Sequence, residues 1–257
     1  MQTSKEVNDK ILEHDRFEKR AEKLLNQNLL EISIFGADSV PHYLRTPYDF
    51  YEKKLSQIIK TDWKLLELGS GTGVHTQTLV KSGANVIASD ISKNSLKILK
   101  NTFKNKSNLK TVQADIEKLP FKDESFDLVA CAGALSYGNS FKVDKEIRRV
   151  LRPGGVFICV DSLNDNLIYK TNRYFHYLKG GRSKITLQNM PSYKRIEIIK
   201  KKYSTVEVKY FGSISYIMPL FSLIFGYKKS KKISDFIDRI FNIKKSAFKF
   251  VLIAKTQ

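Results

Sequence analysis

Residues 65–76 read LLELGSGTGVHT and contain the features that decide the fold. An apolar run carries one acid, Glu67, and three glycines follow at the alternate positions 69, 71 and 73. A glycine-rich turn after a buried strand is typical of a site for a nucleotide-like ligand. The loop that binds nucleoside triphosphates has a lysine after its last glycine, whereas Val74 and His75 follow here, so this motif is excluded. The dinucleotide motif places its third glycine one residue later, which weakens the case for a dinucleotide.

The stretches on either side of this turn alternate between strand and helix patterns. Strands are predicted over 64–68, 85–90, 109–115, 125–133 and 156–161, and helices over 74–81, 92–103 and 141–151. Ser92 is expected to cap the helix over 92–103, and Pro153-Gly154-Gly155 to make the turn into the fifth strand. Alternation with short turns predicts a doubly wound, parallel α/β sheet with helices on both faces. The ligand of such a sheet lies beyond the carboxyl ends of its strands.

Three acids stand at the ends of the first three predicted strands. Glu67 lies within an apolar run, where an unpaired charge is costly, so a plain surface role is unlikely for it. Asp90 can accept both ribose hydroxyls of an adenosine, and Asp115 can accept a hydrogen bond from the adenine amino group. Ile91 and Ile116 could enclose the base, although isoleucine beside a strand is more often plain core. The pattern indicates an adenosine with a polar tail over the glycine turn; for both aspartates the alternative is a turn or helix cap.

At this point the sequence resembles a known family. The stretches ELGSGTG, SDIS, QADIEKLPF, FDLVACA and RRVLRPGGVFI occur in family order over roughly residues 60–162. They resemble the class I S-adenosylmethionine-dependent methyltransferases, in the small-molecule branch that includes quinone-biosynthesis and sugar O-methyltransferases. The resemblance implies S-adenosylmethionine as cofactor and no metal. It also implies that Glu67 orders the glycine turn and that the cofactor is contacted by Gly69, Ser70, Gly71, Gly73, Asp90, Ile91, Asp115, Ile116 and Ala132.

The resemblance extends to the rest of the fold. It implies a seven-stranded Rossmann-like sheet whose seventh strand is antiparallel, and residues 205–212 and 246–255 fit strands six and seven. Residues 1–60 are expected to form a helical cover or lid, with helices within 7–29 and over 47–60. Residues 61–257 then form the Rossmann-like domain. Within it, residues 163–204 are expected to supply substrate-side helices, near 164–178 and 192–203, and residues 213–245 to form a basic amphipathic insertion between strands six and seven.

A methyl acceptor with a high pKa benefits from a general base, for which several residues are candidates. They are His42, Tyr43, Tyr137, Asp161 and His176. In the segment PHYLRTPY (41–48), Arg45 could pair with the cofactor carboxylate if the segment covers the site; a surface loop is the alternative. His75 is expected to have a structural role. Arg173 and Arg182 could bind an anionic substrate, although charges of this kind are more often solvated.

Positive charge is concentrated in the C-terminal third. The net charge of the 257 residues is +19; residues 1–166 contribute +3 and residues 167–257 contribute +16. Such a field favours anionic partners, and a lysine-rich composition of the whole proteome is the alternative. The apolar run 214–227, the stretch KKSKK (228–232) and a predicted helix over 231–242 are typical of an element that lies on a membrane. Two interpretations of 214–245 stay open: peripheral contact with an anionic membrane, and a helical cap that packs on the sheet with its lysines in water.

These features favour one function over several others. Cys131 and Cys159 lie in apolar stretches, which is typical of core cysteines in a protein of a reducing compartment. No run of 18 apolar residues exists that could span a membrane. A cytoplasmic protein is therefore expected, with contact on the inner face of the membrane if residues 214–245 bind it. The leading hypothesis is methyl transfer to a small molecule, first an O-methylation of a sugar or lipid-linked saccharide. A quinone-precursor C-methyltransferase is the alternative. Only the positive charge suggests RNA methylation. Enzymes that methylate a nucleobase or amide nitrogen have an N-P-P-Y-type motif after the fourth strand, and this chain has ACAGALSYG (130–138) there. Nucleic acid is therefore not an expected partner. A cofactor-binding protein without activity is disfavoured by the intact acids and glycines.

Overall fold

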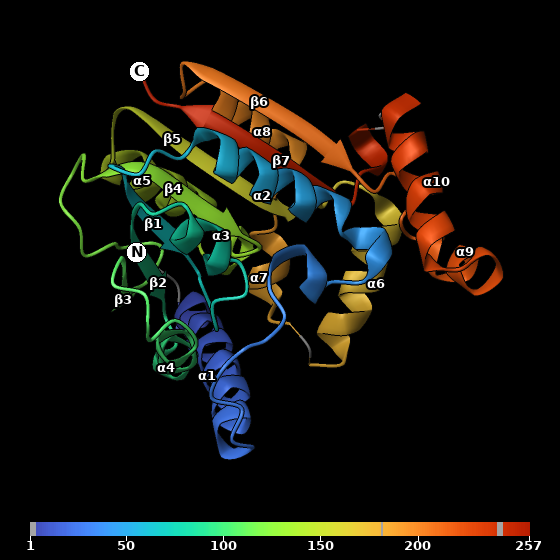
Figure 1. Ribbon diagram of the computed structural model, residues 1–257. Helices are drawn as coiled ribbons and strands as arrows, with labels where there is room; N and C mark the ends of the chain where they lie inside the picture. The colour runs from blue at the N-terminus through green and yellow to red at the C-terminus, as the bar shows by residue number, and fades with distance from the viewer. Residues whose placement is uncertain (1–3, 181, 241–243) are drawn as a thin grey trace.

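The computed structural model describes residues 4–180, 182–240 and 244–257 and contains one seven-stranded sheet (Figure 1). The strand order is β3-β2-β1-β4-β5-β7-β6. β1 to β5 are parallel, and β7 is antiparallel to both β5 and β6. The sheet predicted from the sequence, including its antiparallel seventh strand, is therefore confirmed. The strands are β1 Lys64–Leu68, β2 Asn85–Asp90, β3 Leu109–Gln113, β4 Phe126–Ala132, β5 Leu151–Ser162, β6 Thr205–Phe211 and β7 Lys249–Lys255.

Helices cover both faces of the sheet (Figure 1). On one face lie α2 Thr46–Ile58, α3 Thr76–Lys81 and α4 Lys93–Thr102; on the other lie α5 Ser140–Val150 and α8 Tyr193–Lys200. The cap expected at Ser92 is present, and Ser192 caps α8 in the same way, because each serine side chain accepts a hydrogen bond from a backbone N–H of the first helical turn. Because both faces are covered, β4 is buried along almost its whole length.

The N-terminal segment supplies one helix to a face of the sheet and another to the edge where the parallel strands end. α2 packs on the sheet, with Tyr51 and Leu55 fully buried. α1 Ser4–Asn26 instead contacts α4 and the short helix α7 Lys184–Gln188. The 3₁₀ turns η1 Gly36–Ser39 and η2 His42–Leu44 connect α1 to α2. A cover over the carboxyl ends of the strands is thus provided by α1, whereas the expected domain boundary at residue 60 stays a prediction.

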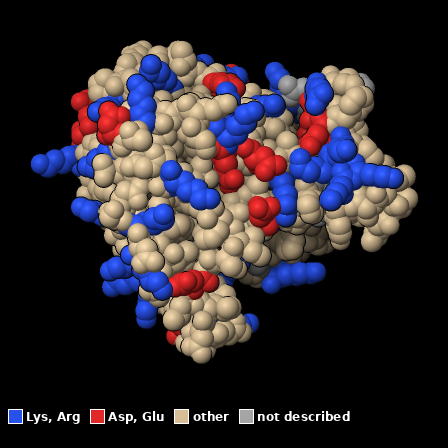
Figure 2. Space-filling model, in the orientation of Figure 1, with Lys and Arg blue, Asp and Glu red and all other residues tan. Residues whose placement is uncertain are grey.

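The C-terminal third adds helices at the β6 end of the sheet. α6 Leu167–Leu178 follows β5, and α9 Met218–Phe225 and α10 Tyr227–Ile240 form a hairpin between β6 and β7 (Figure 1). A 3₁₀ turn, η4 Lys244–Ser246, precedes β7. Basic side chains gather over α10 (Figure 2). KKSKK lies inside α10 rather than before it, because the helix begins at Tyr227, four residues earlier than predicted. Phe241, which the sequence placed on the apolar face of this helix, lies outside the described residues.

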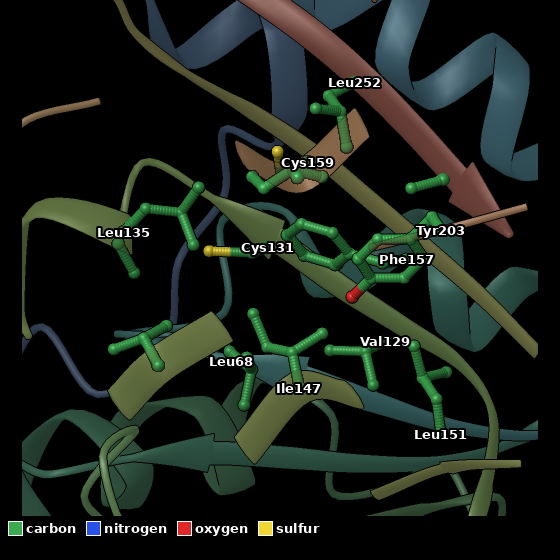
Figure 3. Packing of buried hydrophobic residues seen from close by; sticks show 14 of the residues in the cluster. Leu68, Val129, Cys131, Leu135, Ile147, Leu151, Phe157, Cys159, Tyr203 and Leu252 are labelled. Atoms are coloured by element: carbon green, nitrogen blue, oxygen red, sulfur yellow. The ribbon is translucent and has the colours of Figure 1, made fainter. Parts of the chain in front are cut away.

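The core on the α5 side consists of aliphatic, aromatic and thiol groups from the central strands and the covering helices (Figure 3). Phe157 of β5 and Ile147 of α5 are buried there together with Cys131 and Cys159. Both cysteines are unpaired thiols, and burial raises the pKa of each, so they contribute packing rather than reactivity. This core holds the parallel strands in register, and the strand ends in turn position the site.

Two predicted details of the fold are wrong. Pro153, Gly154 and Gly155 do not form a turn before the fifth strand; they lie within it, because Leu151 already pairs with Phe126 and the register shifts before Leu128. A side chain at Gly155 would come within 2.8 Å of the Arg152 carbonyl oxygen, so the bulge requires glycine there. α7 was not predicted, because five residues carry too short a periodic pattern to be recognised.

Candidate active site

The three glycines of the turn after β1 have different tasks, although each has a positive φ that favours glycine. A side chain at Gly69 would overlap Ala134 Cβ at 2.4 Å, and one at Gly73 would press on Leu99 and Phe103 at 3.0 Å. A side chain at Gly71 would meet nothing within 4 Å, and the backbone of Gly71 lines a cavity. Gly69 and Gly73 therefore allow close packing, whereas Gly71 leaves open the space that a ligand would occupy.

Glu67 stabilises the turn from its buried position in β1. Its side chain is 2% exposed, and Oε2 accepts a hydrogen bond of 2.6 Å from the hydroxyl of Thr76, at the start of α3. Burial, with a smaller contribution from the charge of Asp90, raises the pKa of Glu67 to about 8, despite the Thr76 bond that lowers it. The bond connects the end of β1 to the helix that follows the turn, as the resemblance implied. Within the turn, the buried Oγ of Ser70 has no hydrogen-bond partner among the described residues.

Asp90 holds the same turn from the side. At the end of β2, Oδ2 accepts from the Gly71 N–H at 2.8 Å and Oδ1 accepts from the Ser92 N–H at 2.9 Å. Burial raises the pKa of Asp90, although these backbone donors act against the shift. The carboxylate lines the cavity beside Gly71 and Ile91. It is therefore placed to accept from a ligand's hydroxyl groups while it keeps the turn in shape.

Asp115 meets a basic residue from the N-terminal helix. Oδ1 accepts from the Glu117 N–H at 2.8 Å, and Oδ2 lies 3.0 Å from Lys10 Nζ of α1. Lys10 also pairs with Glu117 at 2.7 Å. Burial lowers the pKa of Lys10, but the hydrogen bonds to Glu117 and Asp115 outweigh burial and raise it above its usual value. Lys10 therefore stays charged and fastens α1 to the end of β3.

These elements enclose a cavity of about 240 Å³ at the carboxyl ends of β1 to β4. Gly69, Gly71, Asp90, Ile91, Asp115, Ile116 and Ala132, all predicted to bind the cofactor, line it together. Glu67 is buried behind the turn, and Gly73 packs on α4 instead of lining the cavity. The open space at Gly71, the carboxylate of Asp90 and the two isoleucines fit an adenosine whose polar tail crosses the glycine turn.

Comparison with known proteins agrees with this geometry. Residues 66–159 match a family model described as a methyltransferase domain. The chain carries a class I S-adenosylmethionine-dependent methyltransferase domain. The family and the cofactor inferred from the sequence are thus confirmed.

Relatives and solved structures add detail about the likeness. A demethylmenaquinone methyltransferase of Staphylococcus carnosus is 34% identical over 128 residues, which are 48% of this chain and 53% of that protein. A sterol 4-C-methyltransferase of Caenorhabditis elegans is 37% identical over 116 residues, or 44% and 34% of the two chains. This chain thus spans about half or less of the length of these relatives. A Haemonchus contortus phosphoethanolamine N-methyltransferase shares the fold, with a TM-score of 0.57 and 18% identity over 82% of this chain and 52% of that one.

Of the candidate bases, one lines the cavity of the methyltransferase domain. Tyr137, in the 3₁₀ turn η3 Leu135–Tyr137, meets the ring of Phe17 edge-on at 5.0 Å. Burial raises the pKa of Tyr137, so its phenol stays protonated at neutral pH and acts as a hydrogen-bond donor. Asp161 is buried behind this turn, where Oδ2 accepts from the Leu135 N–H at 2.9 Å. Asp161 therefore holds the turn in place and does not line the cavity.

The structure places His42, His176 and Arg45 outside the cavity. His42 stacks on Tyr227 of α10 with ring centroids 6.4 Å apart, and His176 is exposed on α6. Arg45 forms an ion pair of 2.7 Å with Asp38 and donates to the Val40 carbonyl. Both contacts lie in the loop that precedes Arg45, so its guanidinium points to that loop. The side chain of Tyr43 lies outside the described part of the chain.

His75 and Arg173 are both held by contacts within the protein. His75 stacks on Tyr48 at 5.0 Å and lies 3.6 Å from Glu52, which agrees with a structural role. Arg173 is 5% exposed and donates to the Leu163 carbonyl and to Asn164, so the expectation of a solvated charge is wrong for it. Burial, with the charge of Arg182, lowers the pKa of Arg173 to about 10.

The sequence reasoning missed the residues that α1 contributes to the cavity. They are Lys10, Glu13, His14 and Phe17. The spacing i, i+3, i+4 and i+7 places them on one face of a helix. This is the spacing that apolar residues have on the buried face of an amphipathic helix, so polar residues at these positions are a signal that the sequence does contain. Glu13 accepts from the Ser183 N–H and the Thr186 hydroxyl, each at 2.8 Å, and so joins α1 to α7. Ile185 of α7 completes the lining.

Replacing Asp90 tests the ribose contact. Asp90→Ala leaves two hydroxyls without an acceptor and frees the Gly71 N–H, so affinity for S-adenosylmethionine should fall by about 1–3 kcal/mol. Titration calorimetry measures the change, and Asp62→Ala, an exposed residue before β1, is the matched control. Equal affinity in both variants would contradict the assignment.

Glu67 should make stability depend on pH. Because its pKa is raised in the folded state, the unfolded chain releases this proton first, and the free energy of unfolding falls as pH rises from about 4.5 to 8. Glu67→Gln keeps an acceptor for Thr76 and removes the proton, so the decrease between pH 5 and 8 should shrink by on the order of 2 kcal/mol. Urea titrations at several pH values measure it, with the exposed Glu22→Gln as control. Parallel curves for wild type and Glu67→Gln would refute the buried, protonated carboxyl.

Proposed function

We propose that this protein transfers a methyl group from S-adenosylmethionine to a lipophilic, ring-bearing small molecule. The observation that carries the proposal is the apolar part of the lining of this cavity. Phe17, Tyr137, Ile185 and Ala134 give that part an apolar and aromatic surface, into which α1 brings the imidazole of His14. An apolar wall with one or two polar groups suits the flat body of a ring and orients its polar substituent.

The relatives support the same class of acceptor. The names of the two relatives described above refer to a demethylated menaquinone and to a sterol. We therefore favour C-methylation of a quinone precursor over the O-methylation of a sugar or lipid-linked saccharide that the sequence suggested first. A sugar needs several hydrogen-bonding side chains around it, and the apolar residues named above offer few. Sugar O-methylation stays a prediction without support from the cavity.

S-adenosylmethionine supplies an electrophilic methyl group, so the residues of this chain have to position the acceptor and manage its proton. His14 is the candidate base. Its Nδ1 lies 3.1 Å from Asp15 Oδ1, and a proton held on Nδ1 by that carboxylate leaves Nε2 to accept one from a ring hydroxyl. Tyr137, kept protonated by burial, donates a hydrogen bond to the acceptor oxygen. Removal of the hydroxyl proton increases the nucleophilicity of the ring carbon beside it as well as of the oxygen. When the carbon takes the methyl group, S-adenosylhomocysteine leaves; the carbon then loses its own proton and the oxygen is protonated again, so that one proton is released in total.

α1 lines one side of the cavity, and charged contacts hold it there. The helix is held by the Lys10 pairs with Asp115 and Glu117 at one end of the lining face, and by Glu13 with Ser183 and Thr186 next to it. Adenine bound at Asp115 competes directly with Lys10 for that carboxylate. Binding of the cofactor is thus coupled to the position of α1, which then excludes water from the acceptor.

Methyl transfer to a demethylated naphthoquinol with an isoprenoid tail tests the proposal. With a labelled methyl group, we expect label in the organic extract. His14→Gln should lower kcat about 100-fold while the affinity for S-adenosylmethionine stays within twofold, because a general base typically contributes that much. His176→Gln, which replaces an exposed histidine outside the cavity, is the control and should keep full activity.

Two outcomes would contradict the proposal. Label transferred to saccharides and not to the quinol would show that the acceptor class is wrong. A His14→Gln variant as active as His176→Gln would show that His14 is not the base.

A further inference from the structure

The α9–α10 hairpin presents an uncovered apolar surface. In α9 Met218 is fully buried, whereas Leu220, Leu223 and Ile224 are 61%, 82% and 68% exposed. Gly226, with a φ of +75°, makes the turn into α10. Single exposed apolar residues are ordinary, but contiguous ones on one short helix mark a surface that binds something.

α10 is fixed to the body of the protein through its acids. Asp238 accepts from the Gly212 and Ser213 N–H groups at 2.6 and 2.9 Å, and Asp235 accepts from the Thr46 hydroxyl at 2.6 Å. Asp235 also pairs with Lys231 at 2.9 Å. The negative charges of the hairpin are therefore turned inward and already satisfied. The hairpin is held in one orientation from its inner side.

The outer side of α10 is cationic and amphipathic. Lys228, Lys229, Lys232 and Arg239 are exposed there, and Phe236 and Ile240 are exposed among them. Figure 2 shows basic side chains around this helix at the right edge of the molecule, next to the uncharged surface of α9. Lysines beside large apolar side chains match a surface with negative groups above an apolar layer.

We propose that the α9–α10 hairpin docks on an anionic lipid bilayer, with α9 at the level of the acyl chains and the lysines of α10 on the headgroups. No helix among the described residues is long and apolar enough to cross a membrane, and α9, with eight residues, is about 12 Å long. The hairpin therefore lies in the interface. Each exposed lysine near such a surface contributes about fivefold to binding, and the apolar residues of α9 add the burial of their side chains.

Two other partners fit only half of this surface. A nucleic acid would match the lysines but leave Leu223 and Ile224 in water. A second copy of the chain would cover the apolar residues but bring two cationic surfaces together. The bilayer accommodates both features.

α6 adds apolar residues beside the hairpin. The hydroxyl of Tyr169 donates to the Gly212 carbonyl at 3.0 Å, and its ring meets Tyr216 at 5.9 Å, so α6 starts against the base of the hairpin. Leu167 and Ile168, at this end of α6, are exposed. These two residues add exposed apolar side chains near the base of the hairpin.

Sedimentation with vesicles tests the proposal on the whole protein without cofactor or acceptor, so its outcome is independent of the proposed methyl transfer. The protein should bind vesicles with 30% phosphatidylserine and release from them at 0.5 M salt. Lys228→Ala/Lys229→Ala/Lys232→Ala should lower the partition coefficient on the order of 100-fold. Lys100→Ala/Lys106→Ala/Lys110→Ala, at the β3 end of the sheet, removes the same charge and should bind like wild type.

A second pair of variants separates the apolar contribution from charge. Leu223→Ser/Ile224→Ser should lower the partition coefficient at least tenfold, and the exposed pair Leu29→Ser/Ile34→Ser should not. Three results would overturn the proposal. The first is that wild type does not bind the vesicles. The second is that Leu223→Ser/Ile224→Ser binds them as tightly as wild type, as expected if the lysines alone form a site for an anion such as RNA. The third is that the protein is a dimer in sedimentation velocity and only Leu223→Ser/Ile224→Ser dissociates it.

Discussion

The hydrogen bond from the Thr76 hydroxyl to the buried carboxyl of Glu67 is the interaction on which the site depends. It fastens the end of β1 to the start of α3 and so helps to hold the glycine turn between them, whose three glycines have positive φ, in one conformation. Asp90 adds a second tie through the Gly71 N–H. Burial makes the charged form of Glu67 costly, so this acid lowers the stability of the fold as pH rises while it holds the turn in shape.

The cover over this turn is joined to it by charge. Lys10 of α1 neutralises Asp115 and Glu117, and Glu13 joins the same helix to α7. α1 therefore contributes both to closure of the cavity and to its chemistry, since His14 and Phe17 lie on the face that these two residues hold down. At the opposite end of the sheet, β6 and the α9–α10 hairpin carry the basic and apolar surface. The donor site and the proposed lipid contact thus use separate parts of one sheet.

Much of the fold and of the donor site could be predicted because the signals are local. Glu67 near the end of β1, Asp90 at the end of β2 and Asp115 just after β3 come to one edge of the sheet by topology alone. The structure brings Asp90 and Asp115 into one cavity, with Glu67 buried behind its glycine turn. The candidates that the structure places outside the cavity depend on tertiary placement. Arg45 and His42 have the right chemistry, but Arg45 pairs with Asp38 in its own loop and His42 stacks on Tyr227 of α10, away from the cavity. His14 went unnoticed because α1 precedes every motif, and only packing on α4 and α7 brings it to the cavity. The bulge at Gly155 was misread as a turn because proline and glycine favour both.

The backbone at Gly71 leaves room for the methyl donor, and the donor site depends on that space. Titration calorimetry of S-adenosylmethionine into wild type and Gly71→Asn tests it most directly, because asparagine tolerates the positive φ of 53° and places a side chain into the cavity. We expect wild type to bind one cofactor saturably and Gly71→Asn to lose this binding. The unfolding temperature of Gly71→Asn should stay within a few degrees of that of wild type. Equal affinity in the two proteins, or no binding by wild type, would contradict a donor site at Gly71.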